Sequence, residues 1–295
     1  MRKKLRFLIY RLRFNLLPKI RQTSGFPTHI DIESTNYCNL DCIHCGRPLM
    51  SGDMGIMDWL VFTKTLRECQ LNNCPSIKLN WRGEPLIHPL LEEMVEVAKK
   101  KAGILEVQLN TNGQLLTPNR SRKLCNAGLD RIIISADGIT RETYEKIRQR
   151  ASWDRLIENI KYLRTLYPRP IIRIQTCVLP QNRHEIKDYY KFWIKYADEI
   201  KIHQSFDPLQ KRAKVLKRKN KRRCPQLWQR LVVAWNGDIH TCCVDWADKG
   251  ILGNIKEMKL KEAWHSSQER YLRFLHKNKI AGIVEPCKNC DNFLT

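Results

Sequence analysis

The sequence predicts an α/β protein with an open, partial (β/α)6 barrel of the TIM type, followed by a small C-terminal domain. Short runs rich in Ile, Leu and Val alternate with amphipathic stretches from residue 28 onward, which is typical of parallel βα units. Six such units fit within 28–206, fewer than the eight of a closed barrel. Polar motifs follow several of these strands, and parallel α/β folds place their active sites at those strand ends.

The strands of the barrel are predicted from hydrophobic runs at 28–35, 76–85 (with its following loop), 104–113, 130–138, 170–180 and 199–206. The helices between them are predicted from apolar residues at helical spacing, at 57–69, 90–103, 117–128, 140–166 and 184–197. The stretch 140–166 is either one helix or two that separate near Ala151. Further along, an Asn-Gly pair at 236–237 predicts a β-hairpin over 230–245, and a helix is expected over 260–277.

These elements divide the chain into four segments. They are a basic amphipathic segment at 1–27, the barrel at 28–210, a basic linker at 211–223 and the small domain at 224–295. A domain of about 70 residues builds only a small core, so we expect bound metal to stabilise it.

The charge is strongly basic, with 53 Lys and Arg against 30 Asp and Glu. Two segments concentrate it: 1–21 has eight basic residues and 211–223 has nine, and neither has an acid. Such segments suit an anionic partner, either a membrane surface or a nucleic acid, although a solvated linker explains the second equally well.

The N-terminal segment predicts an amphipathic helix with an apolar face formed by Leu5, Leu8, Ile9, Leu12 and Leu16. It is too short and too interrupted by arginine to span a bilayer. It would rest on an anionic membrane or dock on the protein itself. Because no cleavage site for secretion follows it, a cytoplasmic location is expected, in solution or peripherally at a membrane.

Twelve cysteines in such a chain indicate metal or redox chemistry. Three of them, Cys38, Cys42 and Cys45, are spaced CxxxCxxC directly after the first strand. Structural zinc needs four protein ligands, whereas three thiolates on a four-iron cube leave one iron open to another ligand. His44 is the nearby candidate for a fourth zinc ligand, so the spacing alone leaves zinc and an iron–sulfur cluster with an open coordination place as alternatives.

This loop resembles the cluster motif of the radical S-adenosylmethionine (radical SAM) superfamily, and three later turns resemble the motifs that follow it. These are "RGEP" (82–85), "NTNG" (110–113) and "SADG" (135–138). The resemblance implies that Cys38, Cys42 and Cys45 hold a [4Fe–4S] cluster whose open iron binds S-adenosylmethionine. Reductive cleavage would then give a 5′-deoxyadenosyl radical that removes a hydrogen atom from substrate, with flavodoxin or ferredoxin as the external electron donor.

The same resemblance assigns residues to the cofactor. His44 would lie near the adenine, and Gly83 and Glu84 would hold the methionyl amino group. Arg82 stands where the family has the first glycine of GGEP, which puts the backbone contact in question. The remaining cofactor contacts implied are Asn110, Asn112, Ser135, Asp137 and Gln175. The family provides no general acid or base to transfer.

The C-terminal cysteines resemble the SPASM/twitch extension of radical SAM enzymes. The resemblance implies one auxiliary [4Fe–4S] cluster held by Cys224, Cys242, Cys287 and Cys290, with Cys243 as the alternative to Cys242. A structural zinc site on the same thiolates is the other interpretation. The remaining cysteines, Cys69, Cys74, Cys125 and Cys177, are expected in the core, although Cys177 is also a candidate hydrogen donor to substrate.

The substrate is the open question. The family suggests a peptide or protein side chain, or a small polar molecule such as a sugar-like alcohol. The excess of basic residues suggests a further class of substrate, a group carried on an anionic polymer, which would be either a nucleic acid or a lipid-linked glycan. A function of another class is a non-catalytic, zinc-stapled protein that binds nucleic acid or membrane.

Overall fold

The computed structural model describes residues 2–203, 224–288 and 290. Within these residues the strands form one nine-stranded sheet, in the order β6-β5-β4-β3-β2-β1-β7-β8-β9. Strands β1 to β6 pair in parallel, β7 is parallel to β1, and β8 and β9 are antiparallel to their neighbours. The bounds are β1 His29–Ile32, β2 Ser76–Lys78, β3 Glu106–Thr111, β4 Arg131–Ser135, β5 Ile171–Cys177, β6 Glu199–His203, β7 Arg230–Val233, β8 Asp238–His240 and β9 Ile251–Asn254.

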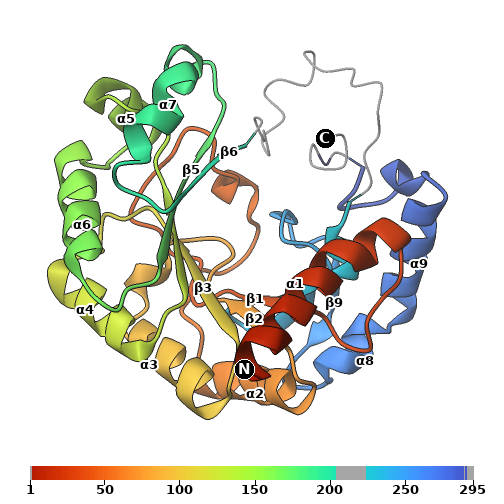
Figure 1. Cartoon of the computed structure of the whole chain (residues 1–295). Coiled ribbons are helices and arrows are strands. Elements are labelled where there is room, and N and C mark those ends of the chain that lie inside the picture. Colours follow the sequence, from red (N-terminus) through yellow and green to blue (C-terminus); the bar gives the residue numbers. More distant parts are fainter. Residues whose placement is uncertain (1, 204–223, 289, 291–295) are drawn as a thin grey trace.

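The helices α2 to α9 form an arc outside this sheet, and α1 crosses in front of it in Figure 1. Their bounds are α1 Arg2–Ile20, α2 Trp59–Leu71, α3 Leu91–Glu96, α4 Pro118–Ala127, α5 Arg141–Ile147, α6 Trp153–Thr165, α7 Ile186–Trp193, α8 Leu260–Trp264 and α9 Ser267–Lys277. The partial barrel of six parallel βα units is therefore confirmed. The linker 211–223 lies outside the described residues.

Two details differ from the expected elements. The helix expected over 260–277 is two helices, because Ser266 caps α9 by accepting a hydrogen bond from the Glu269 amide. The C-terminal hairpin also joins the barrel sheet, since its first strand pairs with β1 over four residues. The break expected near Ala151 is present between α5 and α6, and the Asn236–Gly237 turn is present with Gly237 at φ +97°.

The inner face of β1 carries charged groups instead of apolar side chains. Asp31 is fully buried, and its carboxylate pairs with Lys78 on β2 (2.9 Å) and with Arg230 on β7 (3.1 Å). Burial alone would raise the pKa of Asp31, but Lys78 and Arg230 hold it well below its usual range. The apolar residues of β1, Ile30 and Ile32, belong to the main hydrophobic core instead.

Helix α1 covers the end of the barrel at which the strands begin. The Tyr10 hydroxyl donates to Glu106 at the start of β3 (3.1 Å), and the Phe14 ring meets His29 at the start of β1 edge-on. Gln229, next to the start of β7, donates to the Phe14 carbonyl (2.7 Å). The helix therefore docks on the protein body through Tyr10 and Phe14, and not through the predicted apolar face, whose Leu8 and Leu12 remain exposed.

We predict that Asp31→Asn lowers the free energy of unfolding by about 3–5 kcal/mol, because it leaves two buried cations without their shared carboxylate. Denaturant unfolding of anaerobically purified protein measures this. Asp154→Asn is the matched control, since Asp154 pairs with Arg141 at an exposed site and should cost about 1 kcal/mol or less. Equal losses for the two variants would contradict the prediction.

Candidate active site

The three cysteines of the first motif lie on the loop that leaves β1. Backbone hydrogen bonds from Asp41 to Gln149 (3.2 Å) and from Ile43 to Ile147 (3.0 Å) tie this loop to the end of α5. All three thiols are partly buried. The pKa of Cys42 is raised to about 11, chiefly by burial and also by Cys45, Asp137 and Cys38, while Arg148 opposes them. The three sulfurs are therefore close enough to interact through charge.

Glu84, after β2, is buried and held by three donors. Its Oε1 accepts from the Thr111 hydroxyl (2.7 Å) and the Leu86 amide (3.1 Å), and its Oε2 accepts from the Asn112 amide (2.7 Å). Burial raises the pKa of Glu84, although the bonds from Asn112 and Thr111 act against it. The carboxylate thus joins the turn after β2 to the turn after β3.

Gly83 lies where a side chain has no room. Its φ is +71°, and a Cβ placed there would lie 2.6 Å from the carbonyl oxygens of Thr35 and Tyr37. The Glu84 amide also donates to the Tyr37 carbonyl (2.7 Å). This glycine therefore allows the turn after β2 to pack against the start of the cysteine loop.

Arg82 points elsewhere. Its guanidinium binds both carboxylate oxygens of Glu33 (2.7 and 3.1 Å), reaches Asp248 (2.8 Å) and stacks on the Trp81 ring, 3.9 Å from the ring centroid. Because Asp248 belongs to the C-terminal part of the chain, this side chain links it to the barrel. Arg82, which replaces the glycine of the family motif, thus forms ion pairs with Glu33 and Asp248.

At the end of β4, Asp137 is fully buried beside the cysteine loop. It accepts from the Thr176 hydroxyl (2.9 Å) and the Cys177 amide (3.0 Å), and pairs with Arg148 (2.7 Å). The imidazole of His44 lies 3.6 Å from its second oxygen. Burial would raise the pKa of Asp137, but Arg148 and His44 lower it.

The other expected cofactor residues lie along the same rim. The Asn112 side chain donates to Asn39, inside the cysteine loop (2.9 Å), and Gln175 donates to the Ser135 hydroxyl (3.5 Å). The Asn110 amide donates to Asn80 (2.9 Å). The structure therefore places the ends of β2, β3, β4 and β5 around one loop.

Cys177 ends β5 and is partly exposed, and its register partner on β6 is His203. Gln175 is paired in the same way with Lys201. Neighbouring residues in register share one face of a sheet. Cys177 thus lies beside the rim, while Cys69 and Cys74 are buried in the main core as expected and Cys125 packs against it.

The second set of cysteines gathers around one small apolar cluster. Cys224, Cys287 and Cys290 pack against Leu275 and Ala281. Cys242 is buried, and its electrostatic neighbours include Cys224 and Cys290. These four are the residues expected to hold an auxiliary cluster.

Cys243 lies differently from its neighbour. It packs against Trp81, Val232 and Ala234, and the Trp81 indole donates to its carbonyl (2.7 Å). The pKa of Cys243 is lowered to about 7, chiefly by a hydrogen bond with Cys242 and also by Arg230, against the effect of burial. The Cys243 thiol thus lies near the charged interior of the barrel and is also an electrostatic neighbour of Cys224, so Cys242 and Cys243 both stay candidates for the fourth ligand.

Two side chains at the cysteine sets were not predicted. Arg148 at the end of α5 reaches the Cys42 sulfur (3.8 Å), and His276 on α9 lies 3.4 Å from the Cys287 sulfur. Neither Arg148 nor His276 belongs to a sequence motif, and each lies beside its cysteine only because of the tertiary fold. Arg148 places a fixed positive charge beside a thiolate, which stabilises the ionised form.

The donor chemistry of both sets fits iron–sulfur clusters, whose ligands are soft thiolates. Within the described part of the chain, no three His, Cys, Asp or Glu side chains converge closely enough to share one metal ion. A four-iron cube takes one thiolate at each separate corner, so spread thiols are compatible with it. A cavity of about 410 Å³ adjoins the first set, lined in part by Cys42, Cys45 and Met50.

Comparison with known families agrees with this arrangement. The model of the Radical SAM superfamily matches residues 32–192, more than half of the chain. The model of SPASM, an iron–sulfur cluster-binding domain, matches residues 224–291.

Solved structures share the fold over nearly the whole chain at low sequence identity. BtrN in complex with AdoMet and 2-DOIA has a TM-score of 0.63 at 18% identity, covering 92% of this chain and 94% of that one. anSMEcpe with bound AdoMet has a TM-score of 0.69 at 17% identity, with coverages of 90% and 87%. SuiB of Streptococcus suis bound to S-adenosylmethionine has a TM-score of 0.64 at 16% identity, with coverages of 96% and 73%.

Curated relatives match over part of their length. An uncharacterized protein of Methanocaldococcus jannaschii is 32% identical over 178 residues, 60% of this chain and 57% of the relative. A probable GTP 3′,8-cyclase of Saccharolobus islandicus is 35% identical over 158 residues, 52% and 49% of the two chains. The chain thus spans about half the length of the curated relatives it matches.

We predict that Cys242→Ala lowers the iron content of anaerobically reconstituted protein from about eight to about four atoms per chain, since it removes one corner of the auxiliary cluster. Cys243→Ala is the matched control and should keep the full iron content. Iron and sulfide analysis measures both. Loss of iron from the Cys243 variant alone would reverse the assignment.

Proposed function

The chain belongs to the radical SAM superfamily, and from this membership we propose that it removes a hydrogen atom from a polar, hydroxyl-rich substrate. It is an enzyme of the SPASM type that uses S-adenosylmethionine and [4Fe–4S] clusters. When bound, these groups supply a 5′-deoxyadenosyl radical. The non-catalytic alternative is therefore set aside, and we propose flavodoxin or ferredoxin as the electron donor.

We propose that Cys38, Cys42 and Cys45 hold the cluster that activates S-adenosylmethionine. Glu84 would receive the methionyl ammonium group. Among the described residues its Oε1 accepts two hydrogen bonds and its Oε2 accepts one, so Oε2 keeps a lone pair for another donor. The three protein donors fix the carboxylate in place, which spares the entropy of ordering it when the cofactor binds.

The observation that supports the substrate class is the face shared by β5 and β6. Gln175 lies beside Lys201, and Cys177 lies beside His203. Arg173, on the same face of β5, pairs with Glu199. Amide, ammonium and imidazole groups beside the cofactor rim suit a substrate with hydroxyl groups and a negative charge better than an apolar side chain.

Within this proposal His203 accepts the hydroxyl proton when a sugar-like alcohol is oxidised. An imidazole is the side chain whose ordinary pKa suits proton transfer near neutral pH. The auxiliary cluster, which Cys224, Cys242, Cys287 and Cys290 would hold, would supply an acceptor for the electron that remains on the substrate carbon. BtrN, which shares the fold, was solved with 2-DOIA bound.

A peptide substrate is the second candidate, because two neighbours in fold were solved with peptides. anSMEcpe was solved with the Cp18Cys peptide, and SuiB with the precursor peptide SuiA. Both candidates use the same cofactor site, so the choice between them rests on the substrate-binding face.

We predict that the reduced protein cleaves S-adenosylmethionine to 5′-deoxyadenosine and that the triple variant Cys38→Ala, Cys42→Ala, Cys45→Ala does not. The variant should retain about half of the iron, because the auxiliary set is intact. Cys69→Ala, a core cysteine, is the control and should retain cleavage. Cleavage by the triple variant would exclude these cysteines as the cluster ligands.

We further predict that deuterium moves from a sugar-like alcohol or its phosphate into 5′-deoxyadenosine, detected by mass spectrometry in a screen of deuterated sugars and peptides. His203→Ala should lower substrate oxidation about 10²–10⁴-fold while leaving deuterium transfer detectable, because the hydrogen atom is removed before the proton. Transfer from peptides alone would favour the second candidate.

A further inference from the structure

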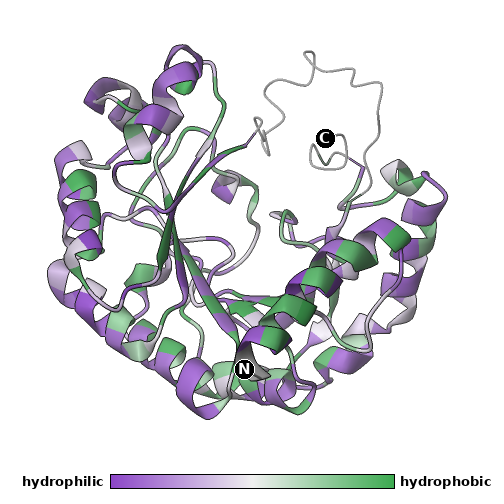
Figure 2. Cartoon of the chain, viewed as in Figure 1, coloured by the Kyte–Doolittle hydropathy of each residue, from purple (hydrophilic) through white to green (hydrophobic). Residues whose placement is uncertain are grey.

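The face of α1 that points away from the barrel is apolar. Leu8 and Leu12 are 64% and 63% exposed, and they lie in one stripe with other apolar residues. The stripe follows the helical period and comprises Leu5, Leu8, Ile9, Leu12, Leu16 and Ile20. Figure 2 shows the hydrophobic colour recurring along the ribbon of α1. The helix is therefore apolar on two faces, one docked and one exposed.

Basic residues border this stripe on both sides. At helical spacing Arg6 and Arg13 lie on one border, and Lys4 and Arg11 lie on the other. The part of α1 described here contains no acidic residue. Arg11 also stacks against Tyr10 and Phe14. An apolar stripe between two basic borders is the arrangement of helices that lie in the interface of an anionic bilayer.

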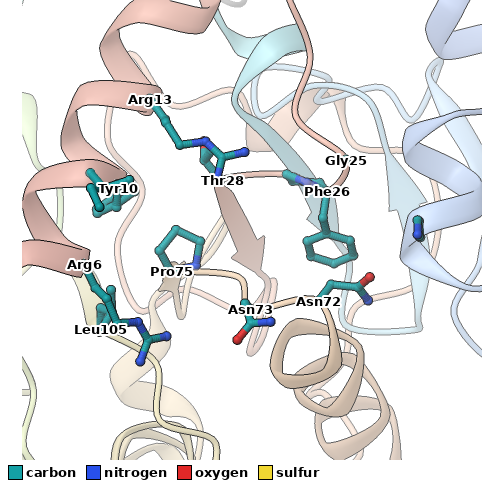
Figure 3. A pocket seen from close by; sticks show the side chains of 13 residues that line it. Arg6, Tyr10, Arg13, Gly25, Phe26, Thr28, Asn72, Asn73, Pro75 and Leu105 are labelled. Atoms are coloured by element: carbon teal, nitrogen blue, oxygen red, sulfur yellow. The ribbon is translucent and has the colours of Figure 1, made fainter. Parts of the chain in front are cut away.

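A pocket of about 470 Å³ opens beside one of these borders. In Figure 3, Arg6 and Arg13 extend from α1 toward it, and Pro75, Asn73 and Phe26 line its other sides. Lys261, at the start of α8, adds a third cation. Within the described residues, the guanidinium groups of Arg6 and Arg13 form no ion pair. Three cations around an amide and an aromatic ring suit a phosphate group with an apolar portion.

We propose that α1 attaches the protein to an anionic phospholipid surface. The leucine stripe enters the boundary between headgroups and acyl chains, and a headgroup phosphate occupies the pocket beside Arg6 and Arg13. The proposal is independent of the radical chemistry, because it involves the end of the barrel at which the strands begin. Among the described residues no helix is long and apolar enough to cross a bilayer.

The test is co-sedimentation of the anaerobic, cluster-containing protein with vesicles. One set is phosphatidylcholine and the other is phosphatidylcholine mixed with phosphatidylglycerol. We expect binding to the mixed vesicles that weakens as salt is added, since surface charge is screened. Absence of binding to the mixed vesicles would overturn the proposal.

The variant Leu8→Gln, Leu12→Gln should weaken vesicle binding on the order of 100-fold, because the variant loses the burial of two leucine side chains in the bilayer. Its control is Leu60→Gln, Leu71→Gln, which changes two leucines of α2 that are 72% and 65% exposed and should bind as the unmodified protein does. Equal binding by the two double variants would contradict insertion of the stripe.

The variant Arg6→Gln, Arg13→Gln should weaken binding about 25-fold, since each basic residue near an anionic surface contributes about five-fold. Lys123→Gln, Lys191→Gln removes the same charge from other exposed positions and should have little effect. If the arginine variant loses affinity for a DNA duplex or for inorganic phosphate while the leucine variant binds vesicles normally, the site is a general anion site and the proposal fails. Circular dichroism and the cluster absorbance confirm that each variant is folded.

Discussion

The buried carboxylates of Asp31, on β1, and Glu33, directly after it, are the constraint on which the arrangement of the molecule depends. Asp31 lies between a lysine of β2 and an arginine of β7, and Glu33 binds the Arg82 guanidinium. A buried charge must be paired to be tolerated, so β1 requires cations from both neighbours. This requirement joins the strand before the cysteine loop to the strand before the C-terminal cysteines. The two cysteine sets are thus supported by one pair of strands.

Arg82, in the turn after β2, also connects the barrel to the C-terminal part of the chain through an ion pair. Where the family has a glycine, this chain has a side chain that reaches Asp248 in the C-terminal part. Its neighbour Trp81 contacts the carbonyl of Cys243, and its ring lies 4.7 Å from that of His240. The turn after β2 therefore carries Glu84, which we propose to bind the cofactor, and it contacts the C-terminal part of the chain through Trp81 and Arg82.

Local patterns in the sequence predicted most of the barrel, because each βα unit is encoded within a few dozen adjacent residues. The motif turns were also predictable, since a short strand must deliver them to the same edge of the sheet. Ser266 and Glu269 form a helix-start pattern that was available in the sequence, and it explains the division between α8 and α9. That division could therefore have been predicted.

Other features depend on contacts between distant residues, and no local pattern encodes them. The pairing of β7 with β1 joins segments about 200 residues apart. Parallel strands are not joined by a short turn, so no turn sequence predicts this pairing. Arg148 and His276 reach their sulfurs only because α5 and α9 end beside them. The choice between Cys242 and Cys243 is likewise not encoded locally, since adjacent residues have the same spacing to every other cysteine within one position.

Helix α1 and the cysteine loop lie at opposite ends of the barrel. The helix closes the end of the barrel where strands start, and the cysteine loop lies where they finish. An enzyme held by that helix would turn its reacting end outward, toward the surrounding solution. A diffusing reductant could then exchange electrons with it, and a water-borne substrate could enter, without either having to pass beneath the anchored side.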